Sequence, residues 1–123
     1  MSYDGLDAYI DHGEYTFVVP GRPKVKERPR HGRNGRVYTP RETLEREKMV
    51  AAVYGGPKFE GPVVVDVTFG QDNTSVTIIE LDQEPTKLRG DIDNYVKLIL
   101  DALNGVAWDD DRQVVILTAA KSY

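Results

Sequence analysis

The chain has 123 residues, a net charge of −4, 40% hydrophobic residues and 29% charged residues, which fits one ordinary folded domain rather than a disordered protein. It contains no cysteine, so disulfides, thiolate zinc sites and cysteine nucleophiles are excluded. No apolar run approaches the roughly 18 residues needed to span a membrane, and the acidic residues 1–14 lack the basic start and apolar run of a signal peptide.

The first half of the chain predicts two extended segments and one helix. Residues 15–19 favour a strand that ends at Pro20. A loop rich in proline, glycine and arginine follows, and residues 36–39 are expected to close a hairpin over Asn34-Gly35, a favoured turn pair. A helix is then expected from about residue 40 to about residue 54.

The second half predicts two strands, over residues 63–69 and 76–81, and then a helix. This helix is expected to be capped by Asp93 or Asn94 and closed by Gly105, a residue typical of helix ends. A last strand, 113–119, is mostly apolar and is expected inside a sheet. The order predicts one α+β domain over residues 1–123, with two helices packed on a mixed β-sheet and residues 1–14 as a peripheral tail.

Basic residues are concentrated in one segment, residues 22–41, which holds eight of them and a single acid, Glu27. Because the local field rather than the net charge steers a phosphate backbone, this segment is a candidate DNA-binding surface. The alternative is a solvated basic loop without a partner. The candidate phosphate contacts are Arg22, Lys24, Lys26, Arg28, Arg30, Arg33 and Arg36.

Two clusters of aspartates flank the predicted second helix. Asp91 and Asp93 precede the helix, and on an extended segment such alternate residues point the same way. Asp109, Asp110 and Asp111 follow it, and they return beside the helix start only if the connecting loop folds back. Mg²⁺ prefers oxygen ligands and is a usual means of hydrolysing a phosphodiester, so the two clusters predict a site for a hard divalent cation.

Each cluster alone also has a plainer interpretation. An aspartate before a helix is typical of a cap, where negative charge is favourable, and the triple aspartate fits a surface turn. Lys97, one turn beyond Asp93, either forms an i, i+4 ion pair or contacts the scissile phosphate. A calcium EF-hand is excluded because the alternation of acids stops at Tyr95.

The chain resembles the RusA-type Holliday junction resolvases, which are crossover junction endodeoxyribonucleases common in phages and prophages. The resemblance runs from about residue 15 to about residue 121, and its motifs are more specific in the C-terminal part. The motifs are Pro23-x-x-Lys26-x-Arg28-Pro29-Arg30, Gly35-x-x-Tyr38-Thr39-Pro40, Gly90-Asp91-Ile92-Asp93-Asn94-x-x-Lys97-x-x-x-Asp101-Ala102-Leu103-Asn104-Gly105 and Trp108-Asp109-Asp110-Asp111-Arg112-Gln113-Val114.

The resemblance implies a homodimer that binds four-way DNA junctions in recombination and repair, each subunit cutting one of two opposed strands with Mg²⁺, for which Mn²⁺ substitutes. It implies that Asp91, Asp93 and Asp111 are catalytic metal ligands, that Lys97 is the catalytic lysine, and that Asp110 is a neighbouring acid of the metal site. No nucleotide cofactor and no membrane partner are expected, and the expected location is the cytoplasm, that of the host if a phage encodes the protein.

The chain departs from the family pattern at one place. Some members carry a basic residue directly before the first aspartate, where this chain has Gly90, with Arg89 one step earlier as a candidate DNA contact. Two rival functions stay open. One is a metal-dependent nuclease for flaps or replication forks, and the other is a junction-binding module without catalysis.

Overall fold

The computed structural model describes residues 10–26 and 30–122, and side chains from residue 13 onward except that of Arg30. The chain divides into two compact units, Met1–Gln83 and Glu84–Tyr123, and each is described by itself. Arg28, one of the predicted phosphate contacts, lies outside the described residues. So does most of the predicted N-terminal tail.

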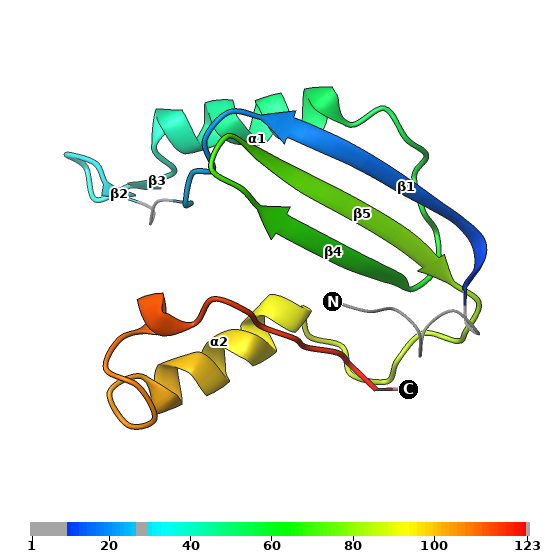
Figure 1. Ribbon diagram of the computed structural model, residues 1–123. Coiled ribbons are helices and arrows are strands. Elements are labelled where there is room, and N and C mark those ends of the chain that lie inside the picture. Colours follow the sequence, from blue (N-terminus) through cyan, green and yellow to red (C-terminus); the bar gives the residue numbers. More distant parts are fainter. Residues whose placement is uncertain (1–9, 27–29, 123) are drawn as a thin grey trace. The chain divides into compact units, whose positions relative to one another are not determined.

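The first unit contains a three-stranded antiparallel sheet in the order β1-β5-β4 (Figure 1). The strands are β1 (Ile10–Pro20), β4 (Val63–Phe69) and β5 (Asn73–Leu81). β1 begins at Ile10, so the end of the predicted acidic tail belongs to the sheet, with Ile10 opposite Leu81. β4 and β5 are joined by a tight turn, in which the Gly70 N–H donates to the Asn73 carbonyl at 2.8 Å.

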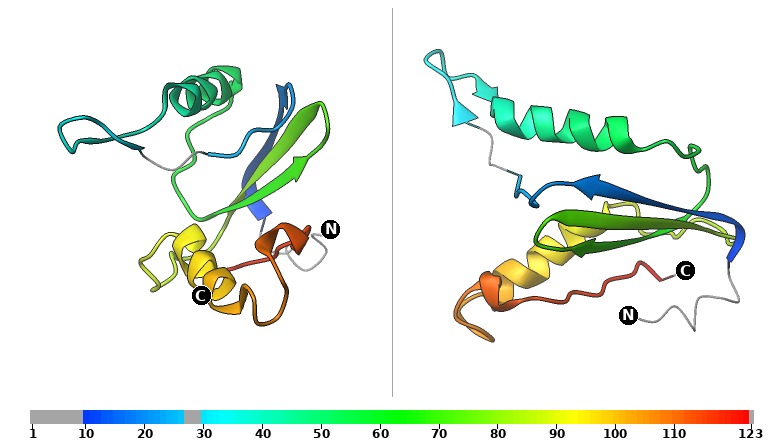
Figure 2. Two further views of the ribbon diagram at one scale, coloured as in Figure 1. Left: turned by 90° about the vertical axis from the view of Figure 1, so that its left-hand side faces the viewer. Right: turned by 45° about the horizontal axis from the view of Figure 1, so that its top comes forward.

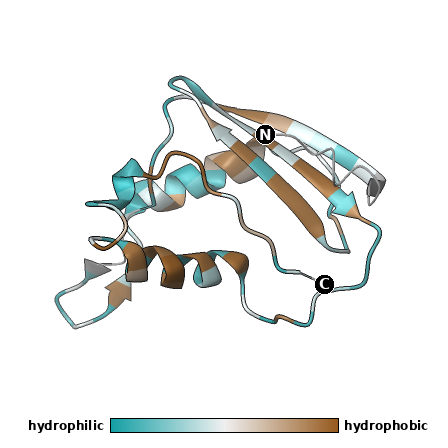
Figure 3. Ribbon diagram, turned by 60° about the horizontal axis from the view of Figure 1, so that its bottom comes forward, coloured by the Kyte–Doolittle hydropathy of each residue, from teal (hydrophilic) through white to brown (hydrophobic). Residues whose placement is uncertain are grey.

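The register gives the sheet one mostly apolar face and one mixed face, on which the buried Ile79 lies opposite Val64. Phe17 lies opposite Val76, and Val76 lies opposite Val67, so these three side chains share a face. Thr16 lies opposite Thr77, which lies opposite Asp66, on the other face. The valine-rich strand β4 is among the most hydrophobic parts of this unit in Figure 3.

Helix α1 (Arg41–Val53) contacts β1 (Figures 1 and 2). Tyr54, which caps its C-terminus, brings its ring edge-on against Tyr15 and Phe17, with centroids 5.1 and 5.3 Å away. Such edge-to-face aromatic pairs stabilise a core beyond the area that they bury. This cluster fixes the end of the helix on the apolar face of β1.

The predicted hairpin is confirmed. β2 (Arg30–His31) pairs antiparallel with β3 (Val37–Tyr38). The turn between them closes with Gly35 donating to the Gly32 carbonyl at 3.0 Å. Gly35 has a φ of 74°, a left-handed conformation that glycine adopts without steric cost.

The second unit contains α2 (Ile92–Leu103), a short 3₁₀ helix η2 (Asp111–Gln113) and an extended C-terminal segment. The prediction of a strand over residues 113–119 is wrong, because these residues pair with no strand in the described part of the chain. β-branched residues favour an extended backbone, but only a hydrogen-bonded neighbour makes that backbone a strand. The sheet is therefore antiparallel rather than mixed, while the predicted α+β class is confirmed.

No helix in the described ranges is long and apolar enough to cross a membrane.

Candidate metal site and basic segment

The first aspartate pair stands at the N-terminus of α2. Asp91 is the residue before the first helical turn, and its carbonyl accepts from the N–H groups of Asn94 at 3.1 Å and Tyr95 at 3.4 Å. Asp93 lies in the first turn. The backbone thus presents two carboxylates, two residues apart, at the helix end that favours negative charge.

Neither carboxylate of this pair has a partner among the residues that the structure describes. Asp91 makes no capping hydrogen bond with its side chain. Both side chains are exposed, and neither forms a hydrogen bond or an ion pair with any residue that the structure describes. The interpretation as a simple capping residue therefore loses its main support at Asp91, and both groups are open to an external cation.

Lys97 is exposed on α2, one turn after Asp93. Among the described residues its ammonium forms no ion pair, with Asp93 or with Asp101. The alternative role of Lys97, an ion pair one helical turn away, is therefore absent among the described residues, and its ammonium is available to a ligand.

The chain reverses direction after α2 in a tight loop at Gly105. Gly105 has a φ of 81°, and its N–H donates to the Trp108 carbonyl at 2.6 Å. The Val106 and Ala107 N–H groups both bond the Leu103 carbonyl, at 2.9 and 2.8 Å. The glycine that predicts the end of the helix is thus also the residue that turns the chain toward the second acidic cluster.

Two carboxylates of the second cluster, those of Asp110 and Asp111, accept local hydrogen bonds. The Trp108 Nε1–H donates to Asp111 Oδ1 at 2.7 Å. Asp110 Oδ2 accepts from the Arg112 backbone N–H at 2.9 Å and from its Nε at 2.8 Å. These bonds, the backbone one first, lower the pKa of Asp110 below its ordinary value.

Gln113 completes a capping box around this short helix. Its Oε1 accepts from the N–H groups of Asp109 at 2.8 Å and Asp110 at 3.1 Å. Arg112 and Gln113 stand in the sequence motif without an assigned role, although an acid followed three residues later by glutamine is a recognisable helix-start signal. The box ties the backbone of Asp109 and Asp110 to the side chain of Gln113.

The aspartates are the right type of ligand for a divalent cation, but the described side chains do not form a complete set of ligands. Within the described residues no three carboxylate or histidine side chains gather into a group that could hold a metal ion. Asp91 and Asp93 nevertheless offer two free carboxylates, and Mg²⁺ is commonly held by one or two carboxylates together with substrate phosphates and water. The assignment of Asp110 and Asp111 to the same site stays a prediction.

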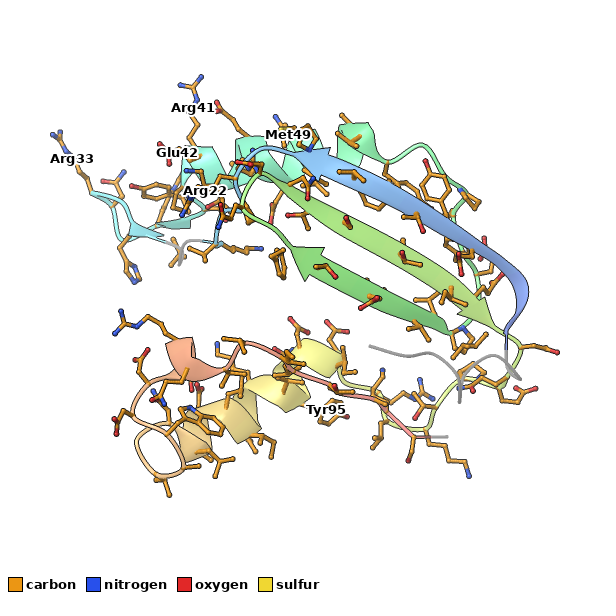
Figure 4. All side chains as sticks on the ribbon, in the orientation of Figure 1. Arg22, Arg33, Arg41, Glu42, Met49 and Tyr95 are labelled. Atoms are coloured by element: carbon orange, nitrogen blue, oxygen red, sulfur yellow. The ribbon has the colours of Figure 1, made fainter. Side chains whose placement is uncertain are left out.

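The described cations of the basic segment that were predicted to bind DNA lie on the loop and hairpin that precede α1. Those whose side chains are described, namely Arg22, Lys24, Lys26, Arg33 and Arg36, are all exposed. Figure 4 shows Arg33 projecting outward from the hairpin. Only the backbone of Arg30 is described, in β2.

Two contacts fasten this basic segment to α1. Arg46 Nη2 donates to the Arg22 carbonyl at 3.4 Å. Lys26 Nζ lies 3.0 Å from Glu47 Oε2 in an exposed ion pair. Lys26 is therefore already paired with an acid, unlike the described side chains of Arg22, Lys24, Arg33 and Arg36. No local sequence pattern predicts this pairing.

Comparison with known families identifies the chain. The family model described as endodeoxyribonuclease RusA matches residues 20–123. The chain belongs to the RusA endodeoxyribonuclease family. The resemblance read from the aspartate motifs is thereby confirmed, and the matched range includes the basic segment and both acidic clusters.

A relative of this RusA family chain is the Bacillus subtilis (strain 168) protein described as uncharacterized protein YqaN. It is 34% identical over 122 residues, which cover 87% of this chain and 86% of the relative. No solved structure gives a significant match.

In this RusA family chain, two cations line a shallow hollow just before the first aspartate pair. A shallow hollow of about 490 Å³ is lined by Pro85, Thr86, Lys87 and Arg89. Arg89 was predicted as a DNA contact, whereas Lys87 was not. The two exposed cations lie within six residues of Asp91 and Asp93 in the chain.

Proposed function

We propose that this protein is a Mg²⁺-dependent endonuclease that resolves four-way DNA junctions by paired nicks in opposed strands. The observation that carries the proposal is that Asp91 and Asp93 at the start of α2, and Lys97 one turn later, have no side-chain partner in the described part of the chain. In a chain of the RusA endodeoxyribonuclease family, unsatisfied carboxylates at a helix start are better explained by a metal and a phosphate than by capping.

The residues have distinct roles in this proposal. Asp91 and Asp93 hold Mg²⁺, which when bound stabilises negative charge on phosphoryl oxygens and lowers the pKa of water. Lys97 donates to the scissile phosphate and stabilises the charge that develops there. Asp111, held in place by the indole of Trp108, is the further acid of the site, and Asp110 supports it.

The basic segment grips the DNA backbone without reading its sequence. Exposed arginines and lysines on a hairpin and loop contact phosphates and release counterions, so the affinity depends strongly on salt. Arg89 and the segment's Arg22, Lys24, Arg33 and Arg36 are the contacts expected among the described side chains. Because its proposed substrate is DNA, the protein is expected to act in the cytoplasm, that of the host if a phage encodes it.

The active form in this proposal is a symmetric homodimer. Resolution requires two opposed cuts, whereas one chain carries one set of catalytic aspartates. Two-fold symmetry places identical sites on opposed strands and is the commonest symmetry of small oligomers. Sedimentation of the full chain at micromolar concentration should therefore give twice the monomer mass, and a monomer both alone and on a junction would refute the paired-nick reaction.

The decisive experiment compares synthetic four-way junctions, flaps, forks and duplexes, each with Mg²⁺, with Mn²⁺ and with a chelator. We expect cleavage of the junction and loss of cleavage with the chelator. Asp91→Asn, Asp93→Asn and Asp111→Asn should abolish cleavage while junction binding survives, because the amide keeps the shape and removes the charge. Cleavage of flaps or forks alone would favour the fork nuclease, and binding without any cleavage would favour the non-catalytic module.

The matched control for the Asp91 and Asp93 variants is Asp101→Asn, which removes another exposed aspartate from α2. It should leave cleavage unchanged. Lys97→Ala should lower the rate by roughly 10²-fold, the scale for removing one stabilising donor, and should barely change the melting temperature. A large loss of stability with normal turnover would show that Lys97 is structural.

A further inference from the structure

The segment that leads into Asp91 is held by side chains from both sides. The Gly90 N–H donates to Tyr95 Oη of α2 at 3.1 Å. The Gly90 carbonyl accepts from Lys121 Nζ at 3.0 Å, and the Leu88 carbonyl accepts from the same ammonium at 3.4 Å. Both backbone polar groups of Gly90 are thus bound by side chains rather than by other backbone groups.

The neighbouring C-terminal residue strengthens this attachment. Thr86 Oγ1 donates to the Ser122 carbonyl at 2.8 Å and accepts from the Leu88 N–H at 3.2 Å. Residues 86–90 therefore run beside residues 121–122, tied by one hydroxyl and one ammonium. Lys121 is half-buried, in contrast to the exposed residues 115–120 that precede it, so its side chain is directed into the protein rather than into water.

Lys121 acts directly on the backbone of the first aspartate. The carbonyl oxygen that it binds belongs to the peptide bond between Gly90 and Asp91. A long lysine side chain loses considerable conformational entropy when it is fixed, so two carbonyl bonds to one ammonium represent a specific attachment. An ammonium has three donors, and the two carbonyls use two of them.

We propose that Lys121 is a positioning residue for the metal site: it fixes the Gly90–Asp91 peptide, and with it the direction of the Asp91 carboxylate, from the C-terminal segment of the chain. Tyr95 holds the same glycine from α2. The inference rests on the proposed function for its catalytic readout but not for its metal-binding readout. Groups that orient metal ligands typically contribute a factor of about 10 to 100 in metal affinity or activity.

The test uses the full chain with Lys121→Met, which keeps the length of the side chain and removes the ammonium, and with Lys121→Arg, which restores donors to both carbonyls. Tyr95→Phe is a second, independent variant that removes the acceptor for the Gly90 N–H and keeps the ring. Lys58→Met is the control, since Lys58 is an exposed lysine of the first unit. Mn²⁺ affinity is measured without DNA by electron paramagnetic resonance, and kcat and KM are measured on a four-way junction.

We expect Lys121→Met to weaken Mn²⁺ binding by roughly tenfold and to lower kcat by a similar factor, with an unchanged KM for the junction. Lys121→Arg should recover most of both losses, Tyr95→Phe should weaken Mn²⁺ binding in the same direction, and Lys58→Met should change neither quantity. A rise in KM with unchanged Mn²⁺ affinity would make Lys121 a DNA contact and would overturn the proposal.

Loss of thermal stability alone, with normal Mn²⁺ affinity below the melting temperature, would also overturn it by making Lys121 merely structural. The two proposals fail separately. If the wild-type protein binds Mn²⁺ but cleaves no DNA, the nuclease function fails, while the change in Mn²⁺ affinity still decides the role of Lys121. If the wild-type protein cleaves junctions and Lys121→Met behaves like it, the positioning role alone is refuted.

Discussion

Gly90→Ala tests how closely the backbone before Asp91 is packed against α2. A Cβ at this position would lie 2.9 Å from two ring carbons of Tyr95 and 3.0 Å from its hydroxyl. Carbon atoms normally pack about 3.5–4.0 Å apart, so the ring has to move. Gly90 is not among the glycines with a positive φ, so alanine brings no backbone strain of its own and the cost comes from this contact.

The magnitude follows from what the ring loses when it moves. Tyr95 is 42% exposed, so its ring has room to rotate and severe overpacking is relieved. Rotation breaks the Gly90 N–H to Tyr95 Oη bond, and a typical hydrogen bond contributes about 0.5–1.5 kcal/mol. We therefore expect Gly90→Ala to lower the free energy of unfolding by about 1 kcal/mol.

A double-mutant cycle measured by urea denaturation isolates this contact. In a Tyr95→Ala background the ring is absent, so Gly90→Ala should cost close to nothing, and the coupling energy should be about 1 kcal/mol. Gly105→Ala is the matched control, because its cost comes from a φ of 81° and should be the same in both backgrounds. Equal costs of Gly90→Ala with and without the Tyr95 ring would refute the reasoning.

Three further outcomes are expected. Lys24→Ala should reduce the slope of log affinity for junction DNA against log salt by up to about 0.9. Lys26→Ala should reduce this slope less, because Lys26 is already paired with Glu47. Equal changes in a salt titration would show that the ion pair opens on DNA. Arg112→Ala should raise the pKa of Asp110 only part of the way to its ordinary value, because the larger cause, the backbone N–H bond, remains; a carboxyl NMR titration checks this. Because the pKa of Asp110 is lowered in the folded state, its contribution to stability is complete above the ordinary aspartate pKa and is lost as the pH falls through the lowered value. Acid denaturation of Arg112→Ala should therefore begin at a higher pH than that of the wild type.

The parts of the fold that could be predicted from sequence are those set by local rules. Asn34-Gly35 gave the hairpin turn because glycine adopts the left-handed conformation freely, and Gly105 ended α2 for the same reason. The error at residues 113–119 arose because strand propensity describes a backbone conformation and does not specify its partner.

In the candidate site, too, the features set by local sequence patterns could be predicted and the long-range contacts could not. The carboxylates of Asp91 and Asp93 were found from their spacing, since alternation before a helix is a local pattern. The contacts that hold them were not, because Lys121 reaches Gly90 across 31 residues. Lys26 likewise pairs with an acid of a different element. Such contacts depend on how distant segments meet, and a single sequence carries no period or turn signal for them.

Because the indole of Trp108 donates a hydrogen bond to Asp111, intrinsic fluorescence can report on the second acidic cluster. Trp108 is the single tryptophan of the chain, so its fluorescence can be excited selectively over that of the seven tyrosines. A cation or phosphate that draws on Asp111 has to compete with the Nε1–H donor at 2.7 Å, and the emission of the indole should shift as that bond weakens. Events at the second acidic cluster can thus be followed in real time in the unlabelled protein, with Trp108→Phe as the silent reference.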